Sequence, residues 1–151
     1  KLLEKAIQLI KVPKIIKIDE QNKEIIMQFI PGEKLSEHFD NLNNKLEVAE
    51  IIGKEISILH DSNIIHGDLT TSNMILNNNQ VYFIDFGLGF DSKKIEDKAV
   101  DLHLLRQALE AKHFSCWKEL FEAVLKGYKS EDKEKILSQL KKVEARGRYK
   151  H

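Results

Sequence analysis

The sequence predicts an α+β fold in which helices outweigh strands. Three observations lead to this prediction: a hairpin pattern near the N-terminus, a second hairpin in the middle of the chain, and apolar residues at helical spacing over most of the remainder. The 151 residues have the length of about one domain, and neither an internal repeat nor a low-complexity linker divides them.

The N-terminal elements follow from apolar spacing and from breakers. Pro13 ends a run of apolar residues at helical spacing, and Pro31 with Gly32 ends a β-rich run. The elements expected here are a helix at 1–11, strands at 14–19 and 24–30 joined as a hairpin, and a short helix at 35–39.

The rest of the chain begins with its strongest helical pattern. Apolar side chains from Leu46 to Leu59 recur at steps of three and four, with charged residues between them. Three consecutive Asn residues at 77–79 then indicate a turn between two short strands. The elements expected here are a helix at 45–60, strands at 74–76 and 81–84, and helices at 97–111, 115–128 and 131–145.

Composition excludes some classes of protein. The lone Cys116 excludes an intrachain disulfide framework and a Cys-based zinc cage, and it favours a reducing, cytoplasmic compartment. No apolar run approaches the roughly 18–20 residues of a membrane span. Charge is balanced overall, but residues 1–18 and 141–151 each carry a net charge of +4, a pattern typical of solvated termini and also of surfaces that bind polyanions.

Two motifs indicate chemistry. The first is His66-Gly67-Asp68-Leu69-Thr70-Thr71-Ser72-Asn73, which fits H-x-D-L-x-x-x-N, and the second is Ile84-Asp85-Phe86-Gly87, whose Asp follows that Asn by twelve residues. Either motif alone is a weak match. Both together, separated by the predicted hairpin, form the pattern of a protein kinase catalytic site.

Phosphoryl transfer explains these residue types, because it depends on positioning and on neutralising charge around a phosphate and its Mg²⁺. Asp68 is the candidate catalytic residue, since its carboxylate can accept the proton of a hydroxyl or orient a water. Asn73 and Asp85 offer the hard oxygen ligands that Mg²⁺ prefers. Gly87 lets the chain turn sharply after the second ligand.

The chain resembles a protein kinase-like C-lobe, and more narrowly the atypical kinase/ATPase subunit of the KEOPS (EKC) complex, the PRPK family, with archaeal members. The motifs that carry this resemblance are Ile64 to Ile75, in which Thr70-Thr71-Ser72 stand where ordinary kinases have a Lys after the Asp, then Ile84 to Gly89, Glu96 to Leu102 and the ending Arg146 to Lys150. The resemblance implies a mostly helical C-lobe at 31–151 and a remnant of the N-lobe sheet at 1–30.

The resemblance also implies an ATP site. Met27, Gln28, Phe29 and Ile30 would form the hinge that holds adenine, and Ile75 and Ile84 would form the apolar floor; ordinary core or strand packing explains the same six residues. Asp101 would anchor the catalytic loop from its helix, with a helix N-terminal cap as the alternative.

Three departures from ordinary kinases bear on activity. A Gly-rich phosphate loop and a V-A-I-K lysine are missing from the sequence, so we expect a truncated N-lobe and weak ATP binding by this chain alone. Gly67 replaces the Arg that reads a phosphorylated activation loop. Only fourteen residues separate Gly87 from Asp101, without Ala-Pro-Glu, which leaves a short platform for a peptide substrate.

The implied function is therefore ATP hydrolysis, with weak Ser/Thr kinase activity, in support of threonylcarbamoyl transfer to tRNA adenosine. The implied cofactors are ATP and Mg²⁺. The implied partners are KEOPS subunits, chiefly a Kae1-type threonylcarbamoyl-transferase and a Cgi-type regulator. tRNA contact through Arg146, Arg148 and Lys150 is implied as well, with a frayed basic end as the alternative. We expect the remaining histidines, among them His60 and His113, at surface or helix-end positions.

Two other functions remain open from the sequence, and a RIO-type kinase is a further enzyme alternative, although the interior of its catalytic loop differs. Small-molecule phosphotransferases of the aminoglycoside or choline kinase type also use His-Gly-Asp, but they need a larger substrate insert than the short segments after Asp85 provide. A pseudokinase scaffold would bind partners without chemistry; the presence of Asp68, Asn73 and Asp85 argues against it.

Overall fold

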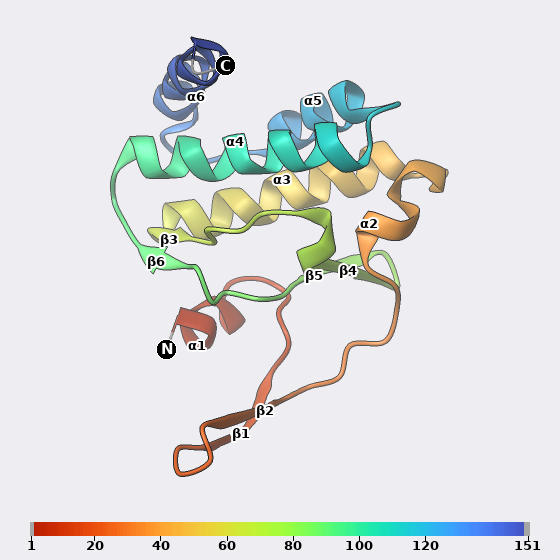
Figure 1. Cartoon of the computed structure of the whole chain (residues 1–151), viewed down its shortest axis with the longest axis vertical. Coiled ribbons are helices and arrows are strands. Elements are labelled where there is room, and N and C mark those ends of the chain that lie inside the picture. Colours follow the sequence, from red (N-terminus) through yellow and green to blue (C-terminus); the bar gives the residue numbers. More distant parts are fainter. Residues whose placement is uncertain (1, 150–151) are drawn as a thin grey trace.

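The computed structural model describes residues 2–149 and has an α+β architecture (Figure 1). Helices α3 to α6 gather at one end, the β1–β2 hairpin projects at the other end, and the β4–β5 hairpin lies between them. In chain order the elements are α1 (Leu2–Ile7), β1 (Ile15–Asp19), β2 (Glu24–Met27), α2 (Leu35–His38), the 3-10 turn η1 (Phe39–Asn41), α3 (Lys45–Asp61), β3 (Ile64–Ile65), the 3-10 turn η2 (Thr71–Asn73), β4 (Met74–Asn77), β5 (Gln80–Phe83), β6 (Phe90–Asp91), α4 (Ile95–Lys112), α5 (Trp117–Gly127) and α6 (Lys133–Tyr149).

The two predicted hairpins are confirmed, each as an antiparallel pair. In the second one, Asn77 pairs with Gln80 across Asn78 and Asn79, which have φ values of 52° and 61°. Two successive residues with positive φ are the pattern of a type I′ turn, which asparagine tolerates better than most residues. This tight turn brings the ends of the 66–73 loop and of β5 to the same side of the hairpin.

Several element boundaries differ from the prediction. Helix α1 ends at Ile7, where the amides of Leu9 and Ile10 both donate to the carbonyl of Ala6 and close the last turn. Strand β2 ends at Met27, so that 28–30 is irregular. Helix α6 continues past the predicted end at 145 to Tyr149, because no Pro interrupts it.

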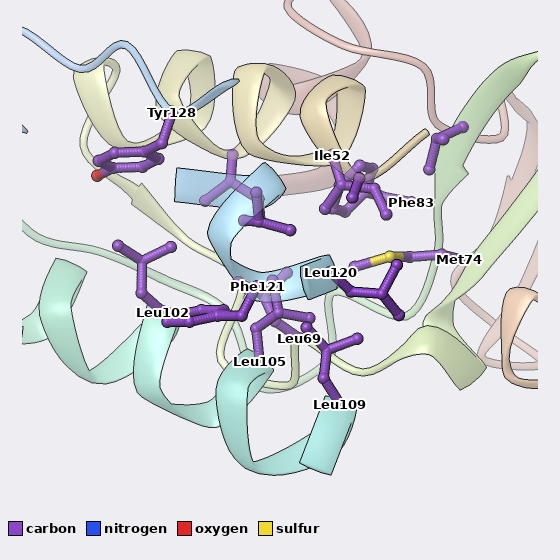
Figure 2. Close-up of a cluster of buried hydrophobic side chains, with 14 of the residues drawn as sticks. Ile52, Leu69, Met74, Phe83, Leu102, Leu105, Leu109, Leu120, Phe121 and Tyr128 are labelled. Carbon is purple, nitrogen blue, oxygen red and sulfur yellow. The ribbon is translucent and has the colours of Figure 1, made fainter. Parts of the chain in front are cut away.

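The core lies between the helical layer and the central hairpin (Figure 2). The motif loop, residues 66–73, is attached to this core. Leu69 lies within the loop, Met74 directly follows it, and both side chains are fully buried in the core. The side chains that surround them come from α3, α4, α5 and β5, and they include Ile52, Phe83, Leu102, Leu105, Leu109, Leu120 and Phe121. The motif loop is therefore supported by the main core and not by a surface cluster.

Helices α3 and α5 approach each other closely through two glycines. A Cβ added to Gly53 would lie 1.9 Å from the carbonyl oxygen of Val124, and one added to Gly127 would lie 2.0 Å from that of Glu50. Because no side chain fits at either point, the two backbones pack directly on each other. No helix in the described part of the chain combines the length and the apolar character needed to cross a membrane.

Glu55 is a half-buried carboxyl group on α3 beside a cavity of about 560 Å³, which Lys11 and Lys54 also line. Its Oε2 atom has no hydrogen-bond partner among the residues that the structure describes. Burial raises the pKa of Glu55 to about 8, although the charges of Lys11 and Lys54 oppose this shift.

The raised pKa of Glu55 predicts a fall in stability with pH. Between pH 4.5 and about 8 the unfolded chain has lost this proton while the folded chain keeps it, so the free energy of unfolding decreases as pH rises. We expect Glu55→Gln to exceed the wild type at pH 8 by on the order of 2 kcal/mol and to match it at pH 5. Urea unfolding at both pH values measures this, with Glu47→Gln on the same helix as control. The same pH dependence in wild type and Glu55→Gln would refute it.

Candidate functional site

Asp68 and Asn73 lie at the two ends of one hydrogen-bonded loop. The side-chain amide of Asn73 donates to the Asp68 carbonyl oxygen over 2.9 Å and to its Oδ2 atom over 3.0 Å. Both side chains are half-buried. The other carboxylate oxygen of Asp68 takes no part in these two bonds, so it is available to accept a proton or to orient a hydroxyl.

His66 joins the two sequence motifs. Its Nε2 atom donates to the carbonyl oxygen of Ile84 over 2.9 Å, and its Nδ1 atom accepts from the amide of Asp68 over 3.1 Å. The imidazole also packs against the ring of Phe86, with centroids 4.6 Å apart. The amide of Ile84 donates to the carbonyl of Asn73, which ties the motifs together a second time. This bridging role of His66 was not predicted; the H-x-D spacing is the signal for it.

Asp101 anchors the loop from α4, as the resemblance implies. Its carboxylate accepts from the amide of His66 over 3.1 Å and from the amide of Gly67 over 3.0 Å. The alternative, a helix N-terminal cap, is wrong, because α4 begins at Ile95 and Asp101 lies well inside it. Asp101 is fully buried, and the hydrogen bonds from these amides offset the free-energy cost of removing its carboxylate from water.

Two further buried hydrogen bonds connect Asp101 to His60 and then to Tyr128, which directly follows α5. His60 donates from Nε2 to Asp101 over 2.8 Å, and its Nδ1 atom accepts from the hydroxyl of Tyr128 over 2.7 Å. Burial raises the pKa of the Tyr128 phenol, which keeps it a neutral donor. His60 and His113 lie at helix ends, one of the two kinds of position expected for them, and both are fully buried.

Gly67 has a backbone role that explains its place in the motif. Its φ is +87°, and an added Cβ would lie 2.3 Å from the carbonyl oxygen of Leu88. An arginine at this position, as in ordinary kinases, would collide with the segment that follows the second motif. The missing Arg is therefore a consequence of how closely this segment packs against the loop.

Asp85 lies on the surface two residues after the end of β5, and its φ of 57° is in the left-handed region. Its Oδ1 atom accepts from the amide of Gly87 over 3.3 Å, which closes a local turn. A strained, exposed aspartate at the end of a strand is a common arrangement at functional sites. The sharp turn directs the chain away from the hairpin and leaves this carboxylate at the rim of a cavity.

This cavity has a volume of about 630 Å³. All six residues predicted for the nucleotide site line it, together with Asp85: Met27, Gln28, Phe29, Ile30, Ile75 and Ile84. Further lining residues that the sequence did not single out are Leu2, Leu3, Pro13, Ile25, Phe86 and Gly87. Asp68 and Asn73 are not part of the lining, and they connect to it through Ile84.

The wall of the cavity is mainly apolar, which suits a flat aromatic base. Phe29 is 83% exposed and Met27 is 47% exposed, values that are high for side chains of this size. Ile30 is 7% exposed and anchors the segment that carries them. Exposed apolar side chains around a cavity with one carboxylate at its rim are typical of a ligand site.

The basic C-terminal residues belong to a helix. Arg146 and Arg148 lie within α6, so the expectation that they follow the last helix is wrong. Arg146 donates to Glu96 of α4 over 2.5 Å, and its side chain remains 57% exposed. Lys150 lies outside the described residues.

Comparison with known proteins identifies the family. A RIO domain model matches residues 1–102. The KEOPS complex subunit Bud32 of Pyrococcus abyssi is 44% identical over 147 residues, which cover 93% of this chain and 67% of that protein. The probable serine/threonine-protein kinase BUD32 homolog of Archaeoglobus fulgidus is 37% identical, with 91% of this chain and 68% of that protein covered.

A third relative is much longer. The probable bifunctional tRNA threonylcarbamoyladenosine biosynthesis protein of Methanobrevibacter smithii is 42% identical over 142 residues, which are 92% of this chain and 26% of that protein. The chain thus spans between about a quarter and two thirds of the length of these relatives. The kinase-like fold, the two linked motifs and these matches agree: the chain belongs to the RIO-domain kinase family, in its Bud32 branch of KEOPS complex subunits.

Proposed function

We propose that the full-length protein hydrolyses Mg-ATP, or transfers its γ-phosphate, as the kinase/ATPase subunit of a KEOPS complex that supports threonylcarbamoyladenosine formation in tRNA. The observation that carries this proposal is the joining of the two motifs by His66, which donates to Ile84 and accepts from Asp68. This link couples the loop of Asp68 and Asn73 to the cavity that Asp85 borders.

In this proposal the cavity of 630 Å³ receives the adenine ring. The segment 27–30 would serve as the hinge, and Ile75 and Ile84 would lie under the base. Backbone groups of Phe29 and Ile30 are suited to this role, because β2 ends at Met27 and the amide of Gln28 already donates to the carbonyl oxygen of Lys14. Residues 1–30 then correspond to part of the N-lobe, and residues 31–151 correspond to the C-lobe.

The donor set around Asp85 fits Mg²⁺. Within residues 2–149, no three His, Cys, Asp or Glu side chains are grouped as a metal cage. Mg²⁺ is typically bound through one or two side-chain oxygens, with substrate phosphates and waters completing its octahedron. Asn73 and Asp85 are assigned as those two ligands. When bound, the ion would neutralise charge on the β- and γ-phosphates.

Asp68 is assigned as the catalytic residue. Its carboxylate accepts the proton of the attacking water or hydroxyl while the γ-phosphoryl group leaves ADP. Asn73 donates to Oδ2 of Asp68 and so fixes the rotation of this carboxylate. Asp101 holds the backbone of the loop in place through two amides.

The segment after the second motif favours hydrolysis or a bound acceptor over broad protein kinase activity. Between Gly87 and the start of α4 at Ile95 it forms only a turn and the two-residue strand β6, which pairs with β3. A peptide substrate would find little surface there on which to lie.

The partners in this proposal are a Kae1-type transferase and a Cgi-type regulator, in the cytoplasm. The names of the relatives support it, since they are KEOPS subunits or bifunctional tRNA-modifying proteins. tRNA contact through Arg146, Arg148 and Lys150 remains part of the proposal. The pair of Arg146 with Glu96 is exposed and therefore weak enough to exchange for a phosphate.

The test follows the γ-phosphate of labelled ATP with Mg²⁺ in the full-length protein, with and without the Kae1-type partner. We expect free phosphate, increased by the partner and lost in Asp85→Ala. Asp132→Asn, a change ahead of α6 and outside the cavity lining, is the matched control.

Two results would overturn the proposal. Label that passes to choline or to an aminoglycoside would make the protein a small-molecule phosphotransferase. The absence of Asp85-dependent turnover, with and without partner, would make it a partner-binding scaffold.

A further inference from the structure

Another buried histidine, His113, contacts the motif loop directly. This residue directly follows α4, and its Nε2 atom lies 2.8 Å from the hydroxyl oxygen of Thr71. Its Nδ1 atom is hydrogen-bonded to Oδ1 of Asp40, in the turn η1. His113 and Thr71 are 1% and 2% exposed, so water does not compete for the bond between them, whereas the side chain of Asp40 is 37% exposed.

The partners fix the direction of these bonds. An ionised carboxylate only accepts, so Nδ1 of His113 carries the proton and donates to Asp40. Nε2 of the neutral ring is then an acceptor, and the Thr71 hydroxyl donates to it. The thiol of Cys116 also donates to Oδ1 of Asp40, over 3.6 Å, which gives that carboxylate oxygen a second donor.

Thr71 lies where the loop turns toward Asn73. It is the first residue of the 3-10 turn η2, which ends at Asn73. Leu69, two residues earlier, is held by the core. The side chain of Asn73 must point back to Asp68 to make its two bonds, so any rotation of the turn at Thr71 would move Asn73 away from Asp68.

We propose that His113, oriented by Asp40, is a positioning residue that clamps Thr71 and thereby sets the geometry between Asp68 and Asn73. This proposal rests on the function proposed above, because it concerns the catalytic loop of that reaction. His113 and Asp40 come from sequence positions 42 and 31 residues away from Thr71, so the clamp also ties α4 and η1 to the active loop.

The test compares variants of the full-length protein in Mg-ATP turnover. Thr71→Val keeps the shape of the side chain and removes the hydroxyl, and we expect kcat to fall about tenfold, with the KM for ATP nearly unchanged. Thr71→Ser keeps the hydroxyl and should retain most of kcat. His113→Leu should match Thr71→Val, and the double variant should be no slower than the slower single variant, because each change removes the bond between His113 and Thr71.

Two further variants separate positioning from general damage to the fold. His113→Gln keeps a polar group near the position of Nε2 and should restore most of the kcat that His113→Leu loses. His103→Leu is the matched control: it changes another histidine, within α4, whose Nδ1 atom has no partner among the described residues. It should leave kcat unchanged.

NMR provides a readout that does not need turnover. We expect His113 as the Nδ1–H tautomer, and we expect Thr71→Val, but not Thr71→Ser, to shift the side-chain amide signals of Asn73. Wild-type kcat in Thr71→Val, or an Nε2–H tautomer of His113, would overturn the clamp. A wild-type protein without turnover would count against the proposed function, and the Asn73 signals would then decide on the clamp alone.

Discussion

Asp68→Asn is expected to lower the ATP turnover of the full-length protein by a factor of about 10²–10⁴, the range typical for removal of a general base. An amide cannot accept the proton of an attacking water. The fold should be unaffected, because the substituted side chain can still present its oxygen to the amide of Asn73, where Oδ2 now accepts over 3.0 Å. The melting temperature should therefore stay within about 2 °C of the wild type.

Single-turnover and steady-state kinetics with labelled ATP measure this effect, and fluorescence titration of ATP separates it from binding. Asp68→Asn should keep its affinity for Mg-ATP, since Asp68 is not part of the cavity lining. Asp85→Ala should instead weaken the dependence of ATP binding on Mg²⁺, because it removes a candidate metal ligand. Turnover of Asp68→Asn within threefold of wild type would assign the proton transfer to another group.

The sequence predicted the loop of Asp68 and Asn73 because both motifs are local. Their spacing indicates the intervening hairpin, which the structure confirms as an antiparallel pair between Met74 and Phe83. The anchoring role of Asp101 came from the resemblance, and the bonds to the amides of His66 and Gly67 confirm it. Features that depend on neighbours within about ten residues were thus accessible from the residues themselves, whereas the Asp101 anchor, 34 positions from Gly67, depended on the resemblance.

The buried histidines were not accessible in the same way. His60 contacts Tyr128 across 68 positions, and His113 contacts Asp40 across 73. Apolar spacing places a histidine on a helix, but it does not say whether another helix covers it. The pair β3–β6 was missed for a different reason, because strands of two residues are too short to show a period.

The contact of α3 with α5 supports the second large effect, which concerns stability. Alanine is normally favoured over glycine inside a helix by about 1 kcal/mol. At Gly53 the added Cβ would lie 1.9 Å from the Val124 carbonyl oxygen and 3.0 Å from the amide nitrogen of Tyr128, both backbone atoms. Neither atom can move without shifting α5, so we expect Gly53→Ala to lower the free energy of unfolding by about 2–4 kcal/mol.

Gly147 offers the same substitution without the collision. It lies in α6, and the nearest atom to an added Cβ is Nε2 of His103 at 3.8 Å, an ordinary contact distance. Gly147→Ala should therefore raise the free energy of unfolding by about 0.5–1 kcal/mol. Urea unfolding of both variants measures the opposite signs, and a stabilised Gly53→Ala would show that α3 and α5 lie further apart than described.

The Gly53 contact also bears on catalysis, because Tyr128 directly follows α5 and its hydroxyl donates to His60. A displaced α5 would withdraw this donor from His60, which in turn orients Asp101 beneath the catalytic loop. Gly53→Ala should thus lose turnover at temperatures where the variant is still folded, as circular dichroism can verify, whereas Gly147→Ala should not. Full activity in folded Gly53→Ala would separate the helix contact from the anchor of the loop.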